Sequence, residues 1–157
     1  MDKDTNIMSV KEYREKISSK SKRKGHPEHD EQVALFKWAS IMNKKTPALE
    51  LLLAIPNGAF YGGHWSVANR MKAEGVQKGV PDIFLPVPMT YTDNAVVTSM
   101  YAGLWIEMKA GKNKPSVEQT WWMEKLDSMG YKVAVCYSCE EAIEVITDYL
   151  DLNSKEE

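Results

Sequence analysis

Two short stretches of the sequence place acidic and basic side chains beside apolar runs. In the first, Pro81 and Asp82 precede the run Ile83–Leu85, and in the second, Glu107 and Lys109 alternate with apolar residues in LWIEMK. Residues two apart in a strand project from the same face, so Glu107 and Lys109 should share one face. An unpaired buried charge costs much free energy, so a carboxylate beside a core needs a cationic partner. Two carboxylates and an ammonium gathered at one place suit a divalent cation.

Phosphodiester hydrolysis requires this chemistry. A hard cation such as Mg²⁺, held by oxygen ligands, stabilises negative charge on phosphate and makes a nearby water a better nucleophile. Asp82 and Glu107 would be ligands, and the main-chain carbonyl of Met108 could supply a third oxygen. Lys109 would orient or activate the attacking water, or support the developing negative charge. The residues therefore predict a metal-dependent nuclease.

Each of these features also has a plain structural explanation. An aspartate before a strand is often a turn residue, and an E-x-K pair is often part of a solvated strand face. The combination of "PD" with an apolar strand that ends in E-x-K is much more specific than either part alone.

The elements that must position these residues alternate between helices and strands. Helical spacing, turn residues and apolar runs predict one helix, a strand, a second helix, two strands, a helix, a strand and a last helix. Their ranges are 27–43, 49–55, 65–74, 81–86, 103–109, 116–130, 131–137 and 138–150. The segment 87–102 could hold a hairpin or a loop. The fold class is thus α/β, with a central mixed sheet of about four strands flanked by helices.

Four helix ends carry specific signals. Ser116 lies three residues before Gln119, and Ser138 lies three before Glu141, which is the spacing of a capping box. Gly130 is placed to end the helix that Ser116 begins. The helix beginning at Pro27 has acidic residues in its first turn, where the helix dipole favours them.

The length and the charge of the chain limit the functions that it can have. A chain of 157 residues suits one domain, and its net charge of −2 means that DNA binding must come from local patches. Residues 1–26 contain eight Lys or Arg against four Asp or Glu, which predicts a disordered tail or an arm that grips phosphates. Residues 27–150 would form the domain and 151–157 a polar tail. The sequence has no apolar run of a membrane span and no apolar signal segment, so we expect a cytoplasmic protein.

The two cysteines form a C-x-x-C motif. Cys136 and Cys139 could be a redox pair or half of a zinc site. A zinc site would need two more ligands, and the three histidines lie far away along the chain. The simpler explanation is that Cys136 is a buried strand residue and Cys139 begins the next helix.

The segments that carry these features resemble the virus-type replication-repair nuclease (VRR-NUC) family of the PD-(D/E)XK nucleases. The matching segments are EQVALFKWA, IPNGA, MKAEGVQKGVPDIFLP, LWIEMKAGKNKPSVEQ, GYKVAV and EEAIEVITDYL, which together span about residues 28–150. The resemblance implies a restriction-endonuclease-like core, dependence on Mg²⁺ or Mn²⁺, and cleavage of DNA. In stand-alone members the substrate is often branched DNA such as a four-way (Holliday) junction, and a phage origin is suggested.

The resemblance also implies further site residues. The family places a glutamate on its first helix, facing the metal, and Glu31 is preferred over Glu28 because the apolar residues that should lock the helix start just after it. The glutamine that the family places after its third strand falls on Gln119, which could touch the site, a water or DNA, or could simply serve its capping box.

The rim of the site offers DNA-binding candidates. Asn57 could shape the rim or merely make its turn. The loops around the site carry four lysines that could contact phosphates, although solvated lysines are the default. They are Lys72, Lys78, Lys112 and Lys114.

A site that cuts one strand needs a second copy to resolve a symmetric junction, so a two-fold homodimer is expected. The adjacent residues Trp121 and Trp122 could be core on one side and a dimer surface on the other. Two alternatives stay open: a nuclease for flaps, nicks or single strands, and a DNA-binding module without catalysis. The intact acidic pair argues against the second, because a binder has no reason to face phosphates with carboxylates.

Overall fold

A four-stranded mixed sheet forms the centre of the domain. The computed structural model describes residues 27–56, 65–93 and 95–150, so the basic arm, Asn57 and the polar tail lie outside the described residues. The strand order is β1-β2-β5-β6, with β1 at Leu53–Ala54, β2 at Ile83–Leu85, β5 at Leu104–Met108 and β6 at Lys132–Cys136. Only β5 and β6 are parallel. The predicted fold class, a mixed sheet between helices, is confirmed.

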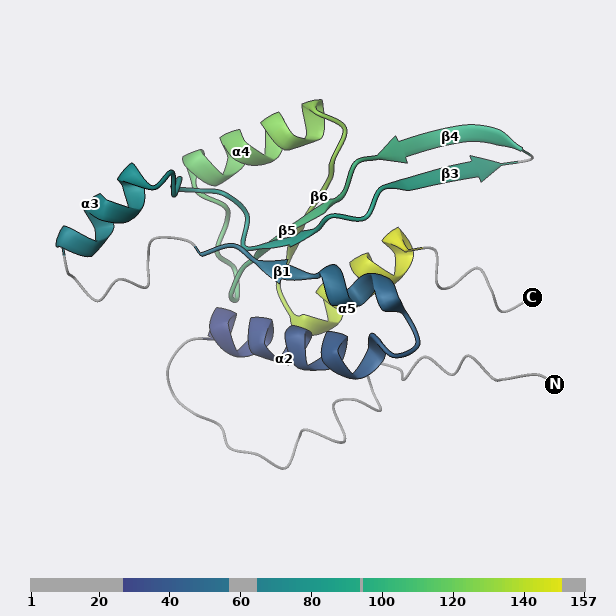
Figure 1. The fold of residues 1–157 in the computed structure, drawn as a ribbon, viewed down its shortest axis with the longest axis horizontal. Helices are drawn as coiled ribbons and strands as arrows, with labels where there is room; N and C mark the ends of the chain where they lie inside the picture. Colours follow the sequence, from purple (N-terminus) through teal and green to yellow (C-terminus); the bar gives the residue numbers. More distant parts are fainter. Residues whose placement is uncertain (1–26, 57–64, 94, 151–157) are drawn as a thin grey trace.

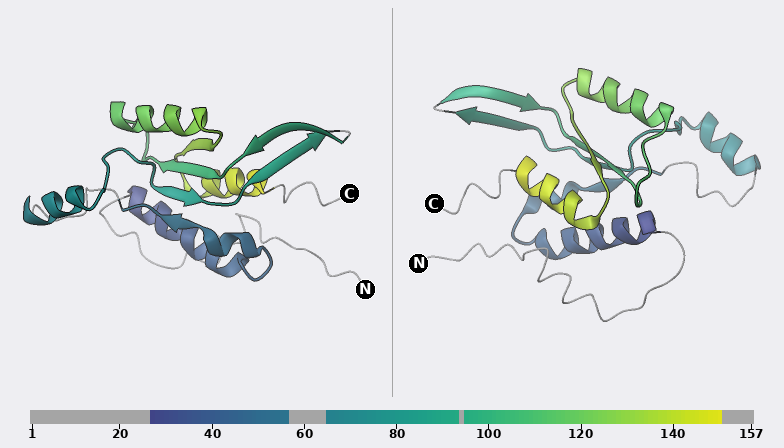
Figure 2. Two further views of the ribbon diagram at one scale, coloured as in Figure 1. Left: turned by 45° about the horizontal axis from the view of Figure 1, so that its top comes forward. Right: turned by 180° about the vertical axis from the view of Figure 1, so that it is seen from behind.

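One face of the sheet carries the hydrophobic core. Helices α2 (Pro27–Met42) and α5 (Cys139–Tyr149) lie together on this face (Figures 1 and 2). Alternation along β2 and β5 turns every second side chain toward them. The side chains buried between sheet and helices are mainly aliphatic and include Leu35, Trp38, Ile83, Leu85, Leu104, Ile106, Met108 and Ile146.

The opposite face is covered by aromatic rings and by α4 (Val117–Ser128). Phe84 and Trp105 are register partners on β2 and β5, and their rings stack with centroids 4.2 Å apart. The predicted capping box begins α4: Ser116 Oγ accepts from Gln119 N, and the Gln119 side chain accepts from Ser116 N. None of the residues of α4 is buried.

The short helix α3 (Trp65–Ala73) precedes the turn that leads into β2. Gly75 follows it with φ +95°, a backbone conformation that glycine adopts without strain. This is the end predicted from the sequence.

The predicted strand 49–55 is wrong over most of its length. Residues Pro47–Leu51 form a 3-10 helix, η1, and only Leu53–Ala54 pairs with β2. Pro47 fixes its own φ near the helical value, and the tight turn places Leu49 in the core. A short apolar run is compatible with either structure, so the sequence pattern alone could not separate them.

The segment between β2 and β5 forms a hairpin. Strands β3 (Met89–Asp93) and β4 (Val96–Tyr101) pair antiparallel and project beyond the central sheet (Figure 1). Tyr91 and Tyr149 tie its base to α5: the Tyr91 hydroxyl donates to the Tyr149 carbonyl, and the Tyr149 hydroxyl donates to the Val87 carbonyl at 2.6 Å. These two hydrogen bonds fix the base of the hairpin against α5.

Both cysteines are buried and unbonded to each other. Cys136 is a core residue of β6 and Cys139 starts α5. Burial raises the pKa of the Cys136 thiol to about 12, which opposes the thiolate that redox chemistry needs. The structural interpretation of the pair is therefore favoured over the redox one.

Candidate active site

The E-x-K motif brings its two charged side chains into contact. The Glu107 side chain is 0% exposed and the Lys109 residue 8% exposed, and Lys109 Nζ lies 2.7 Å from Glu107 Oε1. Both follow Trp105 on the face of β5 away from the core, as their spacing predicts. A salt bridge this deeply buried costs desolvation on both partners, so it is weak evidence for a stabilising role.

Asp82 stands beside this pair at the start of β2. Its carboxylate oxygen Oδ2 accepts from the backbone N of Met108 at 2.9 Å, and its own carbonyl accepts from Ile55 N at 2.7 Å. The antiparallel register of β2 and β5 pairs Ile83 with Ile106, which brings the residue before one next to the residue after the other. Two carboxylates, separated in sequence, therefore meet at one end of the sheet.

The environment of Glu107 opposes its ionisation. Desolvation by burial is the main cause that raises its pKa, from 4.5 to about 7, and the nearby charge of Asp82 raises it further. Contact with Lys109 lowers the pKa and only partly compensates. A buried carboxyl group whose pKa is raised by burial and by a second carboxylate is typical of a functional site that binds a cation.

Gln119 joins α4 to this carboxylate. Its Nε2 donates to Glu107 Oε1, while its Oε1 accepts from Ser116 N at 2.8 Å. The Gln119 side chain therefore does both things that its position suggests: its oxygen caps α4 and its nitrogen contacts Glu107.

The residues present fit a hard divalent cation. Glu107 Oε2 is buried and has no hydrogen-bond partner among the described residues, although its companion oxygen has two. A cation between this oxygen and Asp82 would satisfy the orphaned acceptor and offset the repulsion of the two carboxylates. Within residues 27–56, 65–93 and 95–150 no group of three or more His, Cys, Asp or Glu side chains is placed to hold a metal ion, so backbone or water oxygens would have to complete the ligand set.

The two glutamates of the first helix lie at different places. Glu28 Oε1 accepts from the backbone N of Ala110 at 3.0 Å, directly after Lys109. Glu31 Oε2 accepts from Cys139 N at 2.6 Å, at the start of α5. Of the two acids, the less favoured Glu28 is thus the one in contact with the segment that carries the E-x-K motif, and Glu31 caps a neighbouring helix.

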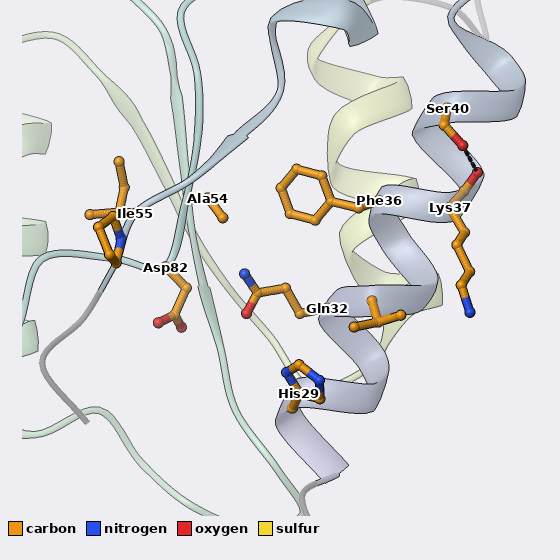
Figure 3. A pocket seen from close by; sticks show the side chains of 10 residues that line it. His29, Gln32, Phe36, Lys37, Ser40, Ala54, Ile55 and Asp82 are labelled. Carbon is orange, nitrogen blue, oxygen red and sulfur yellow. Dashed lines mark hydrogen bonds between the residues drawn. The ribbon is translucent and has the colours of Figure 1, made fainter. Parts of the chain in front are cut away.

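A cavity of about 810 Å³ opens beside Asp82, between α2 and β1 (Figure 3). Gln32 points from α2 toward Asp82, and His29 lies one turn earlier on the same helix. The sequence analysis missed both residues. Their three-residue spacing, continued by Val33 and Phe36, places them on one side of α2 and is the signal that could have found them.

The predicted DNA-binding lysines differ in their surroundings. Lys72 on α3 and the loop residues Lys112 and Lys114 are exposed. Lys78 is also exposed, but its Nζ lies 2.6 Å from Glu118 Oε1, so a phosphate would compete with that carboxylate.

In the described part of the chain, no helix has the length and apolar character of a membrane span.

The mixed sheet, the acids at the start of β2 and the end of β5, and the lysine beside them define the restriction-endonuclease-like class of nuclease folds. The VRR-NUC domain profile matches residues 15–140, beginning within the segment predicted to be an arm, and the chain belongs to this family of nuclease domains. A solved structure described as a VRR_NUC domain protein superposes with a TM-score of 0.62 at 24% identity, covering 83% of this chain and 93% of the other. No curated protein matches the chain.

Proposed function

We propose that this protein is a metal-dependent DNA endonuclease. The observation that carries the proposal is the buried oxygen Glu107 Oε2, which lacks a partner among the described residues and lies in a site with a second carboxylate and a lysine. A purely structural ion pair would gain nothing from Asp82, whose charge makes ionisation of Glu107 harder. A site for a cation that binds phosphate explains all three side chains.

Asp82 and Glu107 would hold Mg²⁺, for which Mn²⁺ can substitute, and the Met108 carbonyl would add a third oxygen. When bound, the cation stabilises charge on the scissile phosphate and lowers the pKa of a water. Lys109 is close enough to Glu107 to be oriented by it, and its ammonium supports negative charge that develops on the phosphate or orients the water. Gln119 fixes the Glu107 carboxylate from α4.

The first helix supplies two acids with different contacts. The Glu31 carboxylate accepts from Cys139 N, whereas the Glu28 carboxylate accepts from Ala110 N. We assign Glu28 the positioning of the chain that follows Lys109, and Glu31 a direct role only if its carboxylate leaves α5.

The substrate we propose is branched DNA, with the four-way junction as the first candidate. A single acidic constellation cuts one strand, so two copies in a two-fold dimer would place one cut in each of two strands. Lys72, Lys112 and Lys114, which are exposed, are proposed to contact phosphates.

The test is cleavage of labelled four-way junction, flap, linear duplex and single-stranded DNA with Mg²⁺, Mn²⁺, Ca²⁺ or EDTA. Wild type is compared with Lys109→Ala and with Lys44→Ala, which removes an exposed lysine just after the far end of α2 and so controls for the loss of one positive charge. We expect cutting in Mg²⁺ and Mn²⁺ that Lys109→Ala loses and Lys44→Ala keeps. Binding of the junction without cleavage in any metal would instead favour a DNA-binding module, and a preference for flaps or single strands would replace the junction.

A further inference from the structure

The cavity beside Asp82, between α2 and β1, has no part in the hydrolysis proposed above. Its volume of about 810 Å³ lies within the range of about 300–1,000 Å³ that is usual for clefts that bind small ligands. Its walls combine apolar side chains, among them Val33, Phe36 and Ile55, with polar ones such as Gln32. Walls of this kind suit a ligand that is apolar on its faces and polar at its edge.

Asp82 belongs both to this cavity and to the active site. Its side chain lines the cavity, and its Oδ2 accepts from the backbone N of Met108, within the E-x-K motif. On the β1 wall, Ala54 pairs with Ile83, the residue after Asp82, so the sheet register fixes this wall against the acid. A DNA strand whose phosphate lies at Asp82 therefore has an adjacent base within reach of the cavity.

The ring of Phe36 offers a stacking surface inside the cavity. It extends from α2 toward β1, where Ala54 lies (Figure 3). Phe36 is half-buried and packs against the hydrophobic core, which holds the ring in this direction. Because Ala54 has a small side chain, the β1 wall leaves space in front of the ring. Nucleobases of every sequence stack on aromatic side chains, because each base has a flat π-face.

Polar side chains of α2 complement the other parts of a nucleotide. Gln32 lies one turn before Phe36 on the same side of the helix and points toward Asp82 (Figure 3). Its amide carries both a donor and an acceptor, which is the combination that pairs with the edge of a base. Lys37 also lines the cavity and is exposed, so its ammonium group suits a phosphate of the same strand.

Only an unpaired base can enter such a cavity. In a continuous duplex each base is stacked between two neighbours and paired at its edge, so extruding it costs free energy, and the cost is least for a base that is already unpaired. The branch of a flap exposes such a base next to the backbone. A cavity for a base beside the acids would therefore distinguish branched DNA from continuous duplex.

We propose that the cavity binds the unpaired base of a nucleotide next to the scissile phosphate, with the base stacked on Phe36 and its edge at Gln32. The proposal rests on the proposed nuclease function and names the feature of the DNA that this site selects. Stacking accepts every base, so the selection concerns the structure of the DNA and not its sequence.

The experiment measures the dissociation constant of a flap DNA, with Ca²⁺ in place of Mg²⁺ so that binding is read apart from cleavage. A single abasic site replaces each base of the unpaired arm in turn, beginning at the branch. For wild type, we expect the abasic site next to the branch to raise the dissociation constant about tenfold, the loss of one base–aromatic stack. Abasic sites further along the arm should have little effect.

Two variants remove the contribution of the cavity by opposite means. Phe36→Leu removes the ring but keeps an apolar side chain against the core. Ala54→Phe fills the cavity from β1, where an exposed strand residue tolerates an aromatic side chain. In both, the abasic site next to the branch should no longer weaken binding, as in a double-mutant cycle. The control is Trp121→Leu, which removes a 52% exposed ring of α4 on the opposite face of the sheet and should keep the tenfold effect.

Circular dichroism shows whether each variant is folded, and Ala54→Phe keeps the test decisive if Phe36→Leu fails to fold. The proposal is overturned if no abasic site weakens binding by wild type, or if the effect of the abasic site persists in folded Ala54→Phe. These outcomes are separate from those of the nuclease. Cleavage of the flap in Mg²⁺ without any abasic effect removes the base site alone, and an abasic effect without cleavage in any metal removes the nuclease alone.

Discussion

The two faces of the central sheet are built from the same strands and differ in almost every property. The face under α2 and α5 is aliphatic, and its side chains from β2 and β5 are fully buried. The face under α4 carries stacked aromatic rings, then a buried ion pair whose second carboxylate oxygen has no partner among the described residues, and a helix with no buried residue. The aliphatic face therefore stabilises the fold, and the opposite face holds charged groups whose burial costs free energy.

The difference arises within β5 itself. Leu104, Ile106 and Met108 point to the core, and Trp105 and Glu107 point away from it, because successive side chains alternate. Neighbouring residues of one strand should therefore respond to substitution in opposite ways. The expected results below test whether stability and activity are divided between the faces as this arrangement suggests.

The largest effect is expected for Glu107→Gln, which keeps the shape of the side chain and removes its charge. Loss of a metal ligand removes several kcal/mol of transition-state stabilisation, so cleavage should fall at least about a thousandfold. Single-turnover cleavage in Mg²⁺ measures this, with circular dichroism to show an intact fold. Near-native activity would mean that the acidic face has no catalytic role.

Ile106→Ala, one residue away, should act on stability. Ile106 is 1% exposed in the core, and removing a buried isoleucine costs about 2–5 kcal/mol. Urea unfolding should show this loss, while cleavage well below the unfolding midpoint stays within a few fold of wild type. A large loss of activity in a fully folded Ile106→Ala sample would show that the two faces are not independent.

The pH dependence of stability gives a smaller effect with a defined sign. The folded-state pKa of Glu107, about 7, lies above its ordinary value of 4.5, so the native state binds this proton more tightly than the unfolded state does. The stabilisation is fully present below about pH 4.5 and is lost as pH rises through about 7. Without divalent cations, the thermal unfolding temperature of wild type, measured relative to that of Glu107→Gln, should therefore decrease as the pH rises from about 4.5 to about 7. A relative midpoint that rises with pH would contradict the account in which burial, and then the charge of Asp82, raise the pKa of Glu107.

Short-range patterns explain what could be predicted from the sequence. Strand alternation is sufficient to place Glu107 and Lys109 on one face, and the Ser116–Gln119 spacing is sufficient to start α4, because both depend on residues close together in the chain. The meeting of Asp82 with Glu107 follows from strand register once the two strands are known to be neighbours. The family membership was predicted from the resemblance of short segments to a known family, and that resemblance implied the fold.

Features that depend on how elements pack could not be predicted. Which acid of α2 contacts the active-site segment depends on the rotation and depth of that helix against the sheet, and the structure gives this contact to Glu28. The cavity with His29 and Gln32 is a property of the space between α2 and β1. The 3-10 turn at Pro47–Leu51 and the held hairpin likewise result from tertiary contacts that an apolar run does not specify.

The smallest effect compares two serines that cap helices on opposite faces. Ser116 Oγ and Ser138 Oγ each accept from a backbone N–H three residues later, and both bonds are 3.2 Å long. Losing such a cap costs about 1 kcal/mol. In Ser138→Ala this cost should appear in global unfolding, because α5 contributes six buried residues to the core. In Ser116→Ala it should appear as faster hydrogen exchange in α4, because a helix without buried residues can fray while the core stays folded. Cleavage should also fall severalfold, because Gln119 then holds the Glu107 carboxylate less firmly. Equal global losses would mean that α4 is as tightly coupled to the core as α5, and the stability of this face would then be intrinsic to the single chain.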